Sequence, residues 1–392
     1  MSWFFKAIRF WRGECTHIRS QFKVSRFRAA FLWAASARKR LAPTASLMIE
    51  KFVFRKKVAV VYFQTENHSN YFDVNRFVEK LNGSRKKVRI FVMSGFPRPQ
   101  QSSSGTEMRQ YYDVHCSSCW RLPCDLFITC LEGNSPCLYP EGSVRVYFQH
   151  ALALSYYNTP SDAFIFVDAV LCPLKSMKED LEQWYSPAPV AIRHPYRFGP
   201  MAAAKSTGEK RLELIIAPTW VQYLNEGYSL YPHLRRIIED CRKLARVVIS
   251  PHPASLQSGA SENEPLRLLA QEYASCPDVF FDFEKSTQIS IGQFAILITD
   301  TSGIMFSAIV DKNLPVIVVD PVGRERSNAE QKILEHGAGE FAAPECVGQT
   351  VTRIKNAHGN YKQGVEAFRA GEFCSSWDDS ELMSYLSSKL GW

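Results

Sequence analysis

The sequence lacks a hydrophobic run long enough to cross a membrane. No uninterrupted apolar segment approaches the ~20 residues that a spanning helix needs. Near the N-terminus there is also no short apolar core followed by a small-residue cleavage site, so we expect no signal peptide. A composition of 46% hydrophobic and 22% charged residues indicates a folded chain rather than a disordered one. A reducing cytoplasm is then the simpler setting for its thiols.

Several motifs that define large enzyme classes are absent. The chain contains no Gly-x-Gly-x-x-Gly and no Walker sequence, which argues against dinucleotide and P-loop sites. It has no Gly-x-Ser-x-Gly elbow, which argues against an α/β-hydrolase. No Asp-x-Asp follows a predicted strand, so a metal held by such a pair would have no ligands. Binding of an anion would then depend on helix dipoles, histidines, arginines and lysines.

The cysteines do not define a metal site, although there are eleven of them. A zinc knuckle needs two ligand pairs at matching spacing, and the one cluster, His-Cys-Ser-Ser-Cys at 115–119, has no second pair. Cys172, Cys241 and Cys276 lie within apolar segments, where a thiol behaves as a small core residue. The sequence therefore predicts neither a metal nor a cofactor.

The net charge of +8 is concentrated at the N-terminus. Residues 1–57 contain 14 lysines and arginines against two glutamates, whereas the remaining chain carries 33 basic and 37 acidic residues. Nine aromatic residues between Trp3 and Trp33 alternate with these cations at roughly helical spacing. We interpret residues 1–56 as a basic, amphipathic helical arm that lies on an anionic membrane surface. Binding of nucleic acid and packing of the arm on its own domain are the alternatives.

The rest of the chain alternates apolar β-branched runs with helical patterns, which indicates α/β domains with mostly parallel sheets. The small, polar and unpatterned segment 199–210 is a candidate linker. It separates an N-terminal domain (57–198) from a C-terminal domain (211–370), which a terminal helix (371–392) follows. We expect two Rossmann-like domains facing a cleft, because a single sheet of this size would exceed the usual strand count.

Individual elements follow from the same patterns. Helices are predicted over 71–81, 176–185, 230–244 and 373–390, and Ser176 with Glu179 has the spacing of a capping box. Strands are predicted over 56–63, 87–95, 125–130, 144–150, 163–173, 213–220, 246–253, 279–283, 295–299 and 314–320.

Four polar turns follow predicted strands, at 149–150, 217–220, 250–253 and 300–303. The carboxyl ends of parallel strands share one edge of a sheet, so the last three turns should lie close together. A helix that begins at 301–303 would present free backbone N–H groups and a partial positive charge, which suits a phosphate. An ordinary helix cap at this turn is the alternative.

Histidines lie in or near these turns. His252 stands between two prolines that fix its backbone, and it could donate a hydrogen bond to a phosphate. His150 ends a strand of the first domain and could take a proton from an acceptor hydroxyl. His194 and Arg193 precede the linker and could line the same cleft. The alternatives are a surface-loop position for His252 and a satisfied core position for His150.

Three motifs resemble those of the CDP-glycerol glycerophosphotransferases, which build teichoic-acid and capsule-type polymers in bacteria. They are Ala-Pro-Thr-Trp (217–220), Ser-Pro-His-Pro (250–253) and Leu-Ile-Thr-Asp-Thr-Ser-Gly-Ile-Met-Phe (297–306), in the family's order and at similar separations. Residues 147–153 are similar to that family's strand ending in Trp-His-Gly, and 167–185 resemble the strand and helix that follow it. The resemblance covers residues 145–322, approximately.

This resemblance implies a B-type glycosyltransferase (GT-B) fold and a metal-independent transferase. A glycerol-phosphate or related polyol-phosphate unit would pass from a CDP-activated donor to a hydroxyl of a lipid-linked or polysaccharide acceptor, with release of CMP. The protein would be peripheral, on the cytoplasmic face of the inner or plasma membrane, and would have no nucleic acid partner. His150 would be the catalytic base. The implied donor-binding residues are Pro218, Thr219, His252, Asp300, Thr301, Ser302 and Gly303.

The chain departs from the family pattern at several of these positions. Gln149 and Ala151 replace the usual tryptophan and glycine, Thr301 replaces a common tyrosine, and Gly303 replaces a second serine. The donor pocket is therefore expected to differ, and CDP-ribitol is an alternative donor. The alternative functions are a nucleotide-sugar glycosyltransferase of GT-B fold and a non-catalytic scaffold held at the membrane.

Overall fold

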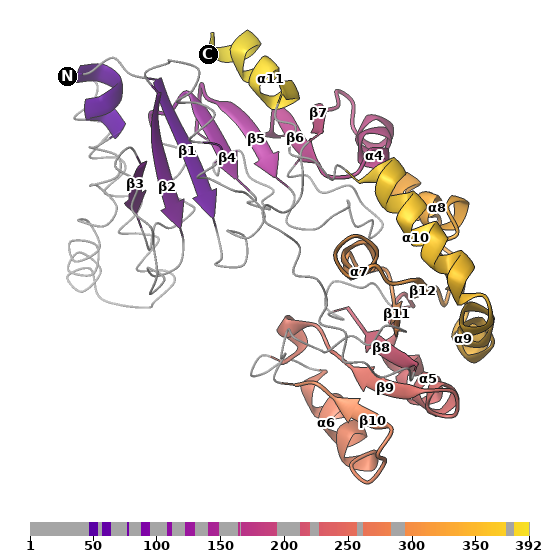
Figure 1. Ribbon diagram of the computed structural model, residues 1–392. Coiled ribbons are helices and arrows are strands. Elements are labelled where there is room, and N and C mark those ends of the chain that lie inside the picture. Colours follow the sequence, from indigo (N-terminus) through magenta and orange to yellow (C-terminus); the bar gives the residue numbers. More distant parts are fainter. Residues whose placement is uncertain are drawn as a thin grey trace, which may run out of the picture. The chain divides into compact units, whose positions relative to one another are not determined.

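The computed structural model describes fourteen stretches of the chain, and within them it forms two β-sheets with helices between the strands (Figure 1). The arm up to residue 46, the cysteine cluster 115–119 and the linker 199–210 lie outside these stretches, as do His150 and His194, so the predicted domain boundaries stay predictions. The described residues are 47–53, 57–63, 77, 88–94, 108–111, 122–129, 140–148, 164, 166–193, 212–219, 227–256, 262–283, 295–373 and 380–391.

The first sheet has seven strands in the order β3-β2-β1-β4-β5-β6-β7, and every pair with a defined register is parallel. The edge strands β3 and β7 were not predicted, because each has only four residues and β7 is largely exposed. The strands are β1 (Lys57–Phe63), β2 (Val88–Ser94), β3 (Met108–Tyr111), β4 (Leu126–Thr129), β5 (Val144–Phe148), β6 (Ala169–Cys172) and β7 (Val190–Arg193).

The second sheet has six strands, all parallel, in the order β10-β9-β8-β11-β12-β13. The predicted mostly parallel α/β class is thus confirmed. The strands of the second sheet are β8 (Glu213–Ala217), β9 (Arg246–Ile249), β10 (Val279–Phe281), β11 (Ala295–Thr299), β12 (Val316–Val319) and β13 (Gly339–Ala342). The helices that follow them are α5 (Leu234–Arg242), α6 (Asn263–Glu272), α7 (Ile304–Lys312), α8 (Asn328–Glu335), α9 (Val347–Asn356) and α10 (His358–Glu372).

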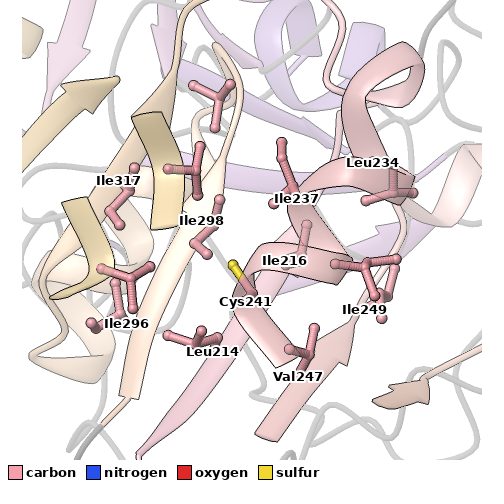
Figure 2. Close-up of a cluster of buried hydrophobic side chains, with 14 of the residues drawn as sticks. Leu214, Ile216, Leu234, Ile237, Cys241, Val247, Ile249, Ile296, Ile298 and Ile317 are labelled. Atoms are coloured by element: carbon pink, nitrogen blue, oxygen red, sulfur yellow. The ribbon is translucent and has the colours of Figure 1, made fainter. Parts of the chain in front are cut away.

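A layer of aliphatic side chains forms the core on one face of the second sheet (Figure 2). Alternate residues of each strand point into it, as the period of a strand requires, and one face of α5 covers them. Residues at the intervening positions, such as Ile215 and Leu297, are also buried, so both faces of the sheet are covered. Cys241 lies in this core, and burial raises the pKa of its thiol to about 12. The labelled members are Leu214, Ile216, Leu234, Ile237, Cys241, Val247, Ile249, Ile296, Ile298 and Ile317.

The predicted capping box at Ser176 is wrong. Ser176 is the first residue of α4 (Ser176–Trp184), and the capping position is Lys175, whose backbone is already helical. Glu372 accepts a hydrogen bond from the Ser176 N–H at 2.9 Å instead. A capping box is present at Ser327 and Glu330, where it begins α8. The sequence signal was therefore correct in kind but was assigned to the wrong helix.

The C-terminal helices also differ from the prediction. Of the predicted helix over 373–390, α11 is described over Ser380–Leu390, Phe373 instead forms a β-bridge with Leu174, and residues 374–379 lie outside the described stretches. Helix α10 was not predicted. At the N-terminal side, a π-helical turn, Ile49–Val53, packs on the first sheet. Its Glu50 is buried and forms an ion pair of 3.4 Å with Arg89 of β2.

The described residues fall into two compact units. The first contains β1 to β4, β5 as far as Tyr147, residues 166–168 and the chain from Ser388 onward, and the second consists mainly of Ala169–Ser387. Strands β6 and β7, with the helix α4 between them, belong to the second unit. Their contacts with α8, α10 and α11 account for this assignment, because α4 contacts α8 and the N–H of Arg193 donates to Glu381 of α11 at 2.9 Å.

Candidate functional site

Four loops meet at the carboxyl edge of the second sheet, after β8, β9, β11 and β12. The order β9-β8-β11-β12 makes each strand a direct neighbour of the next, and all run parallel, so their carboxyl ends lie at one edge. The predicted closeness of the first three turns is thereby confirmed. The Thr299 hydroxyl donates to the carbonyl of Ala217 at 2.6 Å, and the Ser250 N–H donates to the carbonyl of Ile216 at 2.8 Å.

Asp300 is the residue that joins these turns. Its side chain is fully buried, and its carboxylate accepts hydrogen bonds from the Thr219 N–H at 3.1 Å and 3.2 Å and from the Leu230 N–H at 3.3 Å. Burial raises the pKa of Asp300 from 3.8 to about 6, while the hydrogen bonds from Thr219 and Leu230 act in the opposite direction. Asp300 therefore links the turn after β11 to the turn after β8 and to Leu230 from beneath the surface.

Helix α7 begins directly after this carboxylate. The Ser302 N–H donates to the carbonyl of Asp300 at 2.7 Å, and Gly303 stands at the capping position without a side-chain cap. Ser302 Oγ approaches the Ile304 N–H at 3.4 Å, which is long for a hydrogen bond. Thr301 is 3% exposed, so Ser302 and Gly303 present most of the accessible surface. Such a helix start, with its partial positive charge, can bind an anion.

The turn after β9 places His252 at the surface, between the buried Pro251 and a short 3₁₀ helix. The Ser255 N–H donates to the carbonyl of His252 at 2.9 Å, and the Tyr231 hydroxyl donates to Ser255 Oγ at 3.0 Å. Burial raises the pKa of Tyr231 to about 12, so this phenol stays protonated. Tyr231 follows Leu230 directly, so this bond connects the His252 turn to the segment that binds Asp300.

The loop after β12 was missed by the sequence reasoning. The Asp320 carboxylate accepts hydrogen bonds from the N–H groups of Gly323 at 2.9 Å and Arg324 at 3.1 Å. Gly323 has a φ of +66°, a left-handed conformation that favours glycine. The Arg324 guanidinium forms a buried ion pair with Glu330, which also closes the α8 capping box. The signal in the sequence was Asp-Pro-x-Gly directly after a strand, followed by Ser-x-x-Glu.

Of the other predicted site residues, one lies in the same site, one lies in the first sheet and two lie outside the described residues. Pro218 directly precedes Thr219 in the turn after β8 and is buried. Arg193 ends β7 in the first sheet, where its side chain is exposed. His150 and His194 lie outside the described residues, so their roles stay predictions. In the described stretches, no group of three or more His, Cys, Asp or Glu could hold a metal ion, and no helix has the length and apolarity to cross a membrane.

No known family and no curated protein matches the sequence. Solved structures do match the fold. A sucrose-phosphate synthase from Thermosynechococcus elongatus is 10% identical with a TM-score of 0.51, over 85% of this chain and 99% of that one. A UDP-N-acetylglucosamine 2-epimerase from Listeria monocytogenes is 12% identical with a TM-score of 0.52, over 86% and 97%.

The wall teichoic acid polymerase TagF also matches, over 92% of this chain and 96% of that one, at 13% identity. Its TM-score of 0.47 is too low to support an argument about function. The synthase and the epimerase show that the chain has the two-domain α/β GT-B fold, as expected. Because their names denote different reactions on one fold, the fold alone does not define the chemistry.

Proposed function

We propose that this protein is a transferase that moves a glycerol-phosphate or related polyol-phosphate unit from a CDP-activated donor to a hydroxyl group. The acceptor would be a lipid-linked or polysaccharide chain in bacterial cell-surface polymer synthesis. The observation that carries the proposal is the joining of the turns at 218–219, 250–252 and 300–303 at one sheet edge. These are the segments that carry the resemblance to glycerophosphotransferases, and the last of them begins α7.

The proposed donor site holds a diphosphate without a metal. The first N–H groups of α7 and the Ser302 hydroxyl would donate to it, and His252 would donate from the neighbouring turn. These donors are fixed before the reaction starts, so they would stabilise the charge that develops on the leaving group. Thr301 is buried and would act through its backbone N–H.

The proposed reaction is one displacement at phosphorus. The acceptor oxygen attacks the phosphorus on the glycerol side, and a new P–O bond forms. The bond from that phosphorus to the bridging oxygen breaks, and CMP leaves with the electron pair. His150 would take the proton of the acceptor hydroxyl. The positively charged arm would keep the protein on the cytoplasmic face of the membrane, next to a lipid-linked acceptor.

A panel of nucleotides tests this proposal. CDP-glycerol, CDP-ribitol, UDP-sugars and CMP-sugars are each added to the full chain, and thermal unfolding is followed. A ligand at 100 times its dissociation constant adds about 2.7 kcal/mol to the free energy of unfolding. We expect stabilisation by the CDP-polyols, and then release of CMP when an acceptor is present. Stabilisation by sugar nucleotides alone would contradict the CDP-polyol donor, and no stabilisation by any nucleotide would favour a scaffold.

A nucleotide-sugar glycosyltransferase is the second candidate. It is compatible with the GT-B fold, which the chain shares with a sucrose-phosphate synthase. The same site could bind the diphosphate of a sugar nucleotide through the same backbone groups. The panel separates the two candidates through the part of the donor beyond the diphosphate.

A further inference from the structure

A single buried carboxylate connects three parts of the proposed donor site. The Asp300 side chain accepts from Thr219, which belongs to the turn after β8, and from Leu230, which precedes α5. Its backbone carbonyl accepts from Ser302 at the start of α7. Asp300 is 0% exposed, so it cannot itself contact a donor molecule from solvent.

The hydrogen bonds to Asp300 are strongest when its carboxylate is ionised. Two backbone N–H donors point at its two oxygens, and an ionised carboxylate offers only acceptors. The Thr219 N–H contacts both oxygens and the Leu230 N–H contacts Oδ2, so protonation of either oxygen removes at least one of these three contacts, and loss of the charge weakens the others. The neutral side chain therefore holds the two turns less tightly than the carboxylate does.

We propose that Asp300 is a positioning residue whose ionised carboxylate holds the turn after β8 and the start of α7 in the arrangement that binds the donor diphosphate. The inference rests on the proposed function, because it concerns the same site. Asp300 touches neither the donor nor the reacting atoms. Its effect is on donor binding, which weakens when its carboxylate is neutralised.

The direction of the pH effect separates Asp300 from its neighbours. The groups that face this network are Tyr231, Glu262 at the start of α6, and His252 on the turn after β9. Tyr231 stays neutral, and Glu262 faces Tyr231. Positive charge on the His252 imidazole would strengthen binding of a diphosphate. Protonation of Asp300 weakens it, so the two effects have opposite signs.

Calorimetric titration of the full chain with CDP-glycerol from pH 5 to pH 8 tests the proposal, because the diphosphate of this diester gains no proton in that range. Relative to Asp300→Asn, which keeps His252, we expect wild-type affinity to fall about tenfold from pH 7 to pH 5, since only about a tenth of a carboxyl with a pKa of about 6 is ionised at pH 5. Asp300→Asn should bind about ten- to hundredfold more weakly at pH 7, the effect of a hydrogen bond to a charged group. It should show no further fall towards pH 5.

Asp180→Asn is the matched control. Asp180 is also fully buried, also accepts a backbone N–H, and burial also raises its pKa to about 6, but it caps α8. This variant should keep the wild-type affinity and pH profile. A fall towards pH 5 that persists in Asp300→Asn, or that disappears in Asp180→Asn, would overturn the proposal. If no nucleotide binds wild type at all, the proposed function fails as well; if CDP-glycerol binds Asp300→Asn like wild type, only this inference fails.

A second measurement covers the case in which Asp300→Asn does not fold. Amide hydrogen exchange of wild type is compared at pH 7 and pH 5 after correction for the intrinsic rates. Protection of the Thr219 and Leu230 amides should fall at pH 5. The Leu297 amide, which donates to the carbonyl of Pro315 at 3.1 Å, should keep its protection. Equal protection of all three at both pH values would contradict the inference.

Discussion

The carboxylate of Asp180 in α4 accepts a hydrogen bond of 2.8 Å from the backbone N–H of Asn328, and so caps the start of α8. Glu372 at the end of α10 accepts from the N–H of Ser176 at the start of α4. Both carboxylates are buried. Helix α4 is thus bound to two helices that lie more than a hundred residues later in the sequence, and neither bond could be inferred from local patterns.

The Asp180 contact predicts a pH dependence of stability. Burial raises the pKa of Asp180 from 3.8 to about 6, so the folded state binds more protons at this group than the unfolded state between these pH values. The contribution of Asp180 to the free energy of unfolding is therefore largest below pH 3.8 and is lost as the pH rises through 6. Asp180→Asn removes the fall.

Urea unfolding at pH 4, 5.5 and 7 measures this effect. One pKa unit corresponds to about 1.4 kcal/mol, so the variant should gain on the order of 2 kcal/mol relative to wild type from pH 4 to pH 7. Glu179→Gln, an exposed change on the same helix, is the control and should show a constant difference from wild type. A constant difference for Asp180→Asn would contradict the assigned direction.

Gly303 allows the anion-binding and helix-capping interpretations of α7 to be separated. Its φ of −57° and ψ of −13° are accessible to every residue. Aspartate and asparagine cap helices about equally well, but only aspartate adds a negative charge where the diphosphate would bind. Gly303→Asp should weaken CDP-glycerol binding at least about tenfold by charge repulsion, whereas Gly303→Asn should change it little. Equal effects of both variants in calorimetry would indicate that no anion binds there.

The role of His150 as catalytic base stays a prediction, because this residue lies outside the described stretches. His150→Ala should lower the rate of CMP release about 10²–10⁴-fold while leaving donor affinity unchanged. His358→Ala, at the start of α10, serves as the control and should keep full activity. Full activity of His150→Ala, with CMP followed directly, would remove the residue from the mechanism.

The predicted membrane binding of the N-terminal arm can be tested by a deletion that ends at residue 46. Leu47 and Glu50 are buried, so a longer deletion would expose the core of the first sheet. Removal of residues 1–46 should release the protein from anionic vesicles, because about 1 kcal/mol of attraction per Lys or Arg is lost. Vesicles of neutral lipid are the control. Unchanged sedimentation with anionic vesicles would refute the arm's role.

Long apolar strands were the elements that could be predicted from the sequence. The segment Ala295–Thr299 is buried at every position, and such continuous β-branched runs identify a central parallel strand. The short strand β13 was missed because Gly339–Ala342 contains no β-branched residue. It exists through pairing with β12, and Gly339 fits there because a side chain would meet the Val316 carbonyl at 2.4 Å.

The turns of the candidate site were also predictable, because polar residues directly after buried strands have a fixed position in a parallel sheet. The role of Asp300 was not. Asp300 was predicted as a donor contact, and the structure places it beneath the turn, bound to Thr219 and Leu230. A sequence gives the chemical type of a carboxylate, but its burial and its partners depend on segments 70 and 81 residues away.

The sequence by itself determined the α/β class, the positions of the main strands along the chain and the edge of the second sheet at which its polar turns gather. Hydrophobic periodicity and strand direction are local properties, and they suffice for these conclusions. Only the tertiary structure decided which carboxylates are buried and from which backbone N–H groups they accept hydrogen bonds, as with Asp180, Asp300 and Glu372. The physical reason is that burial and hydrogen-bond geometry arise when distant segments pack together, and for Asp180 and Asp300 this burial raises the pKa.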